Sequence, residues 1–145
     1  NFNGAYPSGV TIGCSNGNTI TLTSAQAVTD FLPQGGSPDA LGTSYVNPTA
    51  SDITVLAGNL LAVQLALGFD QYDPNFGASG GFLGDLVINQ GDFQGWTVSE
   101  LVALGNEALG GCNTNYSLSA INDALSAISN NFVDGTSNQG FLDCP

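Results

Sequence analysis

The stretch from Ser51 to Phe69 constrains the fold more than any other part of this chain, because it is apolar on nearly every side. Asn59 and Gln64 interrupt it, and its apolar residues recur at steps of three and four, the period of a helical face: Ile53, Leu56, Leu60, Val63 and Leu67. Such a helix is central to a globular core or spans a membrane. Asp52 and Asp70 bracket only about 17 residues, and no Lys or Arg anchors either end. We therefore expect a buried central helix and no membrane insertion.

Charge is the second constraint. The 145 residues include 12 carboxylates and no Lys, Arg or His, which gives a formal net charge of −12 at pH 7. Such a chain attracts neither nucleic acid nor anionic lipid. No side-chain salt bridge can form, so each carboxylate must be served by water, backbone N–H groups or a bound cation. Most enzyme chemistry also needs an imidazole, an amine or a guanidinium, so we expect no enzyme.

The other segments predict one α+β domain, mainly helical, at residues 10–145, with an arm at residues 1–9. Alternating residues at 10–12 and 19–22, around a CSNGN turn, predict a small N-terminal β-hairpin. Capping signals predict a short helix that is capped by Thr23 or Ser24 and ends at Phe31, helices at residues 37–45 and 97–109, and a last helix from residue 117. The capping-box spacing from Thr49 to Asp52 predicts the start of the central helix. Residues 83–88 suit either a strand or a helical turn.

Carboxylates near helix C-terminal ends indicate candidate cation sites, because the helix dipole opposes a negative charge there. The best cluster is Asp70, Asp73 and Asn75, where carboxylates, an amide and loop carbonyls within six residues suit an all-oxygen Ca²⁺ site. Simple hydration is the alternative for each carboxylate. Weaker candidates are Asp134 with Gly135 and Asn138, and Asp85 with Asp92.

Three cysteines, Cys14, Cys112 and Cys144, suit an oxidising compartment. Cys112 and Cys144 both follow predicted helix ends in Gly-rich sequence, so we predict a bridge between them that closes a loop of about 30 residues. We expect the third thiol, Cys14, to be buried, free or paired between chains.

The N-terminal arm, NFNGAYPSG, has no Met and no basic or apolar leader. We expect this of a mature secreted chain. Phe2 and Tyr6 are costly to expose in an arm without periodicity, so we expect the arm to pack on a neighbouring copy.

The order of segments resembles a domain of secreted surface and adhesin-like proteins of Bacteroidota over roughly residues 10–144. The segments that carry this resemblance are NTITLTSAQAVTDFLPQGG, VLAGNLLAVQLALGFD, LGDLVI, GWTVSELVALGNEALGGC and NFVDGTSNQGFLDC. It implies secretion, disulfide formation and an extracellular structural context, with no catalytic residues to transfer. We expect the chain to depart from that pattern by standing alone, with neither repeats nor a sorting domain. In character it is also similar to extracellular bacterial filament subunits held together by calcium.

Together these features predict a secreted structural protein that self-assembles into an extracellular filament or surface layer, stabilised by Ca²⁺ at Asp-rich loops. The alternative is a monomeric carbohydrate-binding or adhesin module that stacks surface glycans on Trp96, Tyr72 and Phe76. A third hypothesis is a glycosidase built on Glu100 and Glu107, which are seven residues apart and share a helix face. Helix capping by Glu100 and surface solvation of Glu107 explain this pair more simply.

Overall fold

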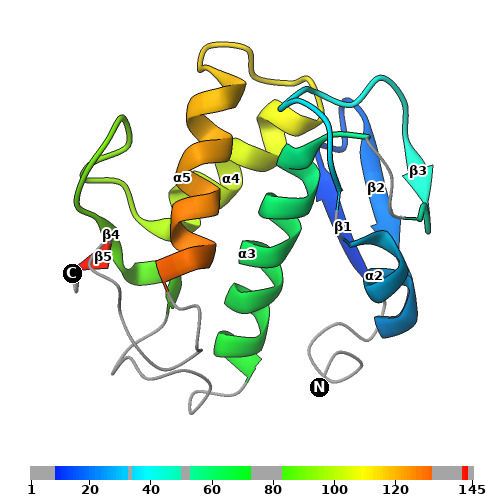
Figure 1. Cartoon of the computed structure of the whole chain (residues 1–145), viewed down its shortest axis with the longest axis horizontal. Coiled ribbons are helices and arrows are strands. Elements are labelled where there is room, and N and C mark those ends of the chain that lie inside the picture. Colours follow the sequence, from blue (N-terminus) through cyan, green and yellow to red (C-terminus); the bar gives the residue numbers. More distant parts are fainter. Residues whose placement is uncertain (1–8, 33, 50–52, 73–82, 132–141, 144–145) are drawn as a thin grey trace.

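The computed structural model describes residues 9–32, 34–49, 53–72, 83–131 and 142–143, with side chains at all of these except 69–72, 83 and 131. The described residues form a mainly helical α+β domain, as the sequence predicts. A small sheet lies on one side of a central helix and the last helix lies on the other (Figure 1), while the helix Val98–Leu109 packs against both of these helices and against the first strand.

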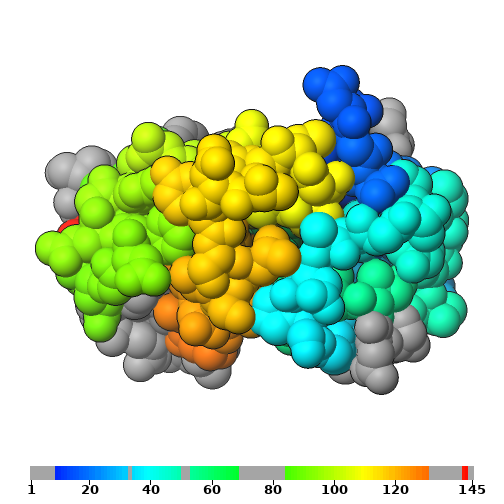
Figure 2. All heavy atoms as spheres, turned by 90° about the horizontal axis from the view of Figure 1, so that it is seen from above, coloured from blue at the N-terminus to red at the C-terminus, as the bar shows by residue number. Residues whose placement is uncertain are grey.

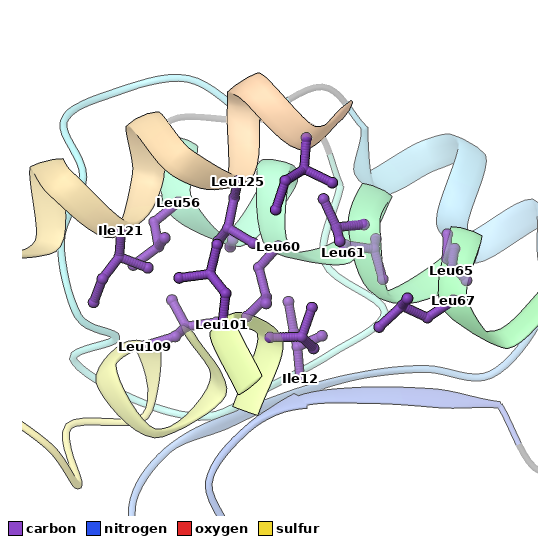
Figure 3. Close-up of a cluster of buried hydrophobic side chains, with 14 of the residues drawn as sticks. Ile12, Leu56, Leu60, Leu61, Leu65, Leu67, Leu101, Leu109, Ile121 and Leu125 are labelled. Atoms are coloured by element: carbon purple, nitrogen blue, oxygen red, sulfur yellow. The ribbon is translucent and has the colours of Figure 1, made fainter. Parts of the chain in front are cut away.

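The central helix is α3, Val55–Tyr72, and it is buried as expected. It packs against α4, Val98–Leu109, and α5, Leu118–Asn131, and also meets the sheet. Figure 3 shows leucine side chains from these three helices meeting Ile12 of the first strand. The fully buried members of this core include Ile12, Leu56, Leu60, Leu61, Leu101, Leu109, Ile121 and Leu125. Among the described residues, no helix combines the length and the apolar character that crossing a membrane requires.

The start of α3 differs from the prediction. Thr49 lies outside the helix, Asp52 lies outside the described residues, and the first helical residue is Val55. The buried Thr54 hydroxyl accepts the N–H of Leu56 at 3.2 Å and donates to the Ser37 carbonyl at 3.1 Å. Thr54 thus satisfies a free N–H group at the helix start.

The predicted hairpin is confirmed as β1, Val10–Gly13, paired antiparallel with β2, Thr19–Leu22. Val10, Ile12, Ile20 and Leu22 are buried on the face toward the helices, whereas the threonines between them point away. A third strand, β3, Tyr45–Val46, adds to β2 in parallel, with Thr21 opposite Val46. It is the outermost strand in Figure 1.

The helix predicted at residues 37–45 is wrong. This segment is irregular and ends in β3, because its backbone groups bond to distant parts of the chain. The Asp39 N–H donates to the Thr54 hydroxyl at 2.9 Å, and the Leu41 N–H donates to the Leu109 carbonyl at 2.8 Å. Tertiary partners therefore override the local helix-start signal.

The remaining elements follow the sequence closely. Helix α2, Ala25–Phe31, is capped by Ser24, and α4 begins with the predicted capping box of Thr97 and Glu100. The ambiguous segment contains both of the expected structures: a 3₁₀ turn, η1, Leu83–Asp85, and then strand β4, Val87–Ile88. Strand β5, Leu142–Asp143, returns antiparallel to β4.

Candidate functional site

The main predicted cation site lies almost wholly outside the described residues. Helix α3 continues through Tyr72, so the backbone of Asp70 belongs to its last turn. Asp73, Asn75 and Asp134 fall outside the described residues, as does the side chain of Asp70. Calcium binding at these positions therefore stays a prediction.

The weaker candidates that are described sit apart from any metal-binding group. Asp85 is exposed in η1, and Asp92 is exposed in the turn after β4. Where the structure describes side chains, no group of three or more His, Cys, Asp and Glu could hold a metal ion. Asp85 and Asp92 would need oxygen ligands from elsewhere to complete a site.

The acidic side chains of the described part share one property: all of them are exposed to solvent. They are Asp30, Asp39, Asp85, Asp92, Glu100, Glu107, Asp123 and Asp143. Because the chain has no cationic side chain, every charged side chain on this surface is negative.

The two glutamates of the glycosidase hypothesis occupy structural positions. A Glu100 carboxylate oxygen accepts the Thr97 N–H at 2.9 Å, and the Thr97 hydroxyl accepts the Glu100 N–H at 3.1 Å. The Glu107 carboxylate is exposed and accepts from the Asn113 side-chain amide at 3.4 Å. This arrangement favours the simpler explanation given above for both residues.

The disulfide joins Cys14 to Cys112, so the predicted Cys112–Cys144 bridge is wrong. The turn between β1 and β2 packs on the C-terminal end of α4, where the Asn18 N–H donates to the Gly110 carbonyl at 3.0 Å. Gly110 is required there, since a Cβ at this position would clash with Cys14. The bridge spans 98 residues, and local sequence signals do not reveal a contact of that range. Cys144 itself lies outside the described residues.

Side-chain amides make the cross-links that salt bridges make in other proteins, and these bonds were not predicted from the sequence. Asn106 on α4 accepts the Gly13 N–H at 2.9 Å and donates to the Gln64 carboxamide oxygen at 2.9 Å. Gln64 on α3 in turn donates to the Thr11 carbonyl at 3.0 Å. One amide pair therefore ties together α3, α4 and the outer edge of β1.

Three further side-chain amides act in the same way. Asn59 on α3 donates to the Asn122 side chain on α5 at 2.9 Å, and Asn122 is only 9% exposed. Gln34, 6% exposed, donates to the carbonyls of Phe31 and Thr49 at 2.7 and 3.1 Å and accepts the Ile53 N–H at 3.3 Å. A signal for these bonds was present in the sequence, because Asn59 and Gln64 interrupt an otherwise apolar helix.

Three aromatic rings pack together beside two surface hollows. Trp96 contacts Phe93 and Tyr116 edge-on, with ring centroids 5.0 and 5.6 Å apart. Trp96 is half-buried and packs on the core, while Tyr116 is 44% exposed. Of the stacking face predicted for glycans, only Trp96 can be assessed, because the Tyr72 side chain and all of Phe76 lie outside the described residues.

Tyr116 borders a hollow of about 330 Å³ that is also lined by Ala40, Asn113, Ser117 and Leu118. Figure 2 shows this side of the molecule, where residues 110–120, in yellow to orange, adjoin the cyan segment that contains Ala40. The second hollow, about 240 Å³, lies where the start of α5 meets the turn after β4 and is lined by Phe93, Asp92 and Asp123.

Comparison with known proteins found no matching family model, no similar curated protein and no similar solved structure.

Proposed function

We propose that this chain is a secreted structural protein that assembles with copies of itself into an extracellular filament or surface layer, with Ca²⁺ bound at Asp-rich loops. The observation that carries the proposal is the charge distribution. The chain has a net charge of −12 and no cationic side chain, and every carboxylate whose side chain is described is exposed.

Contact between two such copies is opposed by electrostatic repulsion, and neither copy can offset it with Lys or Arg. Monovalent salt screens exposed charges over about 8 Å at physiological ionic strength, but it screens closely apposed carboxylates much less. A divalent ion held between carboxylates removes the repulsion directly. Carboxylate and carbonyl oxygens favour Ca²⁺ over softer metals, and Mg²⁺ gives up its water reluctantly. The residues proposed to bind the ion are Asp70, Asp73 and Asn75, followed by Asp134 and Asp85.

The internal bonding of the domain is consistent with this role. Its described tertiary cross-links are mainly amide and hydroxyl hydrogen bonds and a disulfide. Among the described carboxylates, the exposed Asp143 also takes part, because it accepts the Asn89 side-chain amide at 3.1 Å. The described carboxylates all remain at the surface. A fold held in this way suits a protein that persists outside the cell.

Light scattering and negative-stain electron microscopy in CaCl₂ and in EDTA test the proposal. We expect polymers in calcium that revert in EDTA to species of one or two chains. The double substitution Asp70→Asn and Asp73→Asn should weaken calcium-dependent assembly. Asp39→Asn with Asp123→Asn, which removes the same charge at two exposed positions, should not. A parent chain that does not assemble in calcium, or two double variants that respond alike, would contradict the proposal.

A second candidate function, binding of a neutral glycan, is favoured by the hollow beside Tyr116. The exposed ring of Tyr116 packs edge-on against Trp96, and Asn113 and Ser117 add polar groups to the lining of the hollow. A glycan array decides this candidate. Binding that is lost in Tyr116→Ala would support a glycan site there, and an array without any bound glycan would remove it.

A further inference from the structure

The sheet presents a solvent-facing surface that the helices leave uncovered. Thr11, Thr21 and Val46 stand opposite one another in a row across β1, β2 and β3, so their side chains share one face. The hydroxyl oxygens of Thr11 and Thr21 lie 3.3 Å apart, and Val46 is 71% exposed. We call this surface, made by Thr11, Thr19, Thr21, Thr23 and Val46, the threonine face.

The threonine face carries no charge. No carboxylate occurs in residues 9–29 or 40–49, and these two ranges include the three strands of this sheet, β1, β2 and β3. The described carboxylates instead belong to the helices α2, α4 and α5, the turn η1, strand β5 and two loops. On a chain of charge −12, this is the surface that a second copy can approach at the lowest electrostatic cost.

The geometry favours contact through the face of the sheet over addition of strands at its edges. The outer edge of β1 is not free to pair with another strand, because its backbone groups already have side-chain partners. Gln64 donates to the Thr11 carbonyl, and Asn106 accepts the Gly13 N–H. The opposite edge is β3, which is two residues long and offers a strand little to pair with. Sheets can instead pack face to face at about 10 Å, and β-branched side chains such as Thr and Val suit that contact.

We propose that the threonine face is a self-association surface that packs against the same face of a second copy without calcium. This inference rests on the proposed self-assembly and names one of its contacts. A contact between identical faces closes on itself and yields a dimer. Growth into a filament or layer then needs a different contact, which is the role proposed above for the calcium sites.

Sedimentation equilibrium of the whole chain in EDTA and 150 mM NaCl tests this directly. We expect a reversible dimer, of about twice the 14.7 kDa chain mass. Val46→Asp should raise the dissociation constant at least tenfold, whereas Val46→Thr, which keeps the shape and neutrality, should change it little. Ala103→Asp adds the same charge at an exposed position of α4 and is the matched control. A monomeric parent, or equal weakening by the two aspartate variants, would overturn the proposal.

NMR of the parent chain supplies a second readout that does not depend on the folding of any variant. Dilution in EDTA should shift the amide signals of Thr11, Thr21 and Val46 and leave those of α5 unchanged. Shifts confined to the helices would overturn the inference. The two proposals fail separately: calcium-driven assembly of a chain that is monomeric in EDTA rejects the threonine face alone. A stable dimer that ignores calcium rejects the calcium-dependent assembly alone.

Discussion

Removal of the Asn106 side chain should destabilise the domain, because this amide joins three elements. Asn106→Ala would remove the bonds of this side chain to the Gly13 N–H and to the Gln64 carboxamide oxygen, each 2.9 Å long. A hydrogen bond contributes a net of about 1 kcal/mol, so the loss is about 2 kcal/mol. The third bond of Asn106, to the Val102 carbonyl within the same helix, adds little to this total.

Helix propensity offsets part of that loss. Alanine is better than asparagine inside a helix by about 0.5 kcal/mol, which reduces the expected net cost to about 1.5 kcal/mol. For a chain of this size, that corresponds to a fall of about 5 °C in Tm. Urea unfolding followed by circular dichroism measures the change in the free energy of unfolding. Gln26→Ala, which removes one exposed amide bond to Asp30 on α2, is the control and should change stability by less than about 0.5 kcal/mol.

A double-mutant cycle isolates the bond itself. Gln64→Ala and Asn106→Ala, alone and together, should show a coupling free energy of about 1 kcal/mol, because the two amides contact each other directly. An Asn106→Ala variant as stable as the parent, together with additive effects of the two substitutions, would refute the view that amides replace salt bridges in this fold.

The disulfide leads to two further predictions and the charge to a third. Cys14→Ser should lower the free energy of unfolding by about 4 kcal/mol, since the Cys14–Cys112 bridge closes a loop of nearly 100 residues; an unchanged unfolding curve would contradict this. Thiol titration of the unfolded, unreduced chain should find one free thiol, from Cys144, and two or more would show that the bridge is absent. In EDTA, raising NaCl from 10 to 500 mM should raise Tm, because the side-chain charges all repel one another and salt screens only repulsion. A Tm that falls with salt would show that attractive charge pairs stabilise the fold.

Much of the fold could be predicted because it follows from local patterns. The apolar run around Leu60 identified the buried helix, the alternation at Ile12 and Ile20 identified the hairpin, and the spacing of Thr97 and Glu100 identified the start of α4. Each of these signals lies within one element. The packing that follows from them is largely dictated by which residues are apolar.

The errors arose where a segment's partners are distant in sequence. Residues 37–45 carry a helix-start signal, but the Leu41 N–H bonds to Leu109 and the segment runs irregularly into β3. The partner of Cys112 is 98 residues away, and only the docking of the hairpin turn on α4 brings it close. The same limit applies to the candidate calcium site, whose ligands can come from separate loops or separate copies. Its residues could be nominated from the sequence, but their arrangement could not.

The most direct test of the central claim is sedimentation velocity of the parent chain at constant ionic strength, with NaCl, MgCl₂ or CaCl₂ as the varied salt. The account predicts large assemblies in CaCl₂, few in MgCl₂ and none beyond the dimer in NaCl, because bound Ca²⁺ removes repulsion that screening cannot. The same distribution of species in all three salts would contradict it.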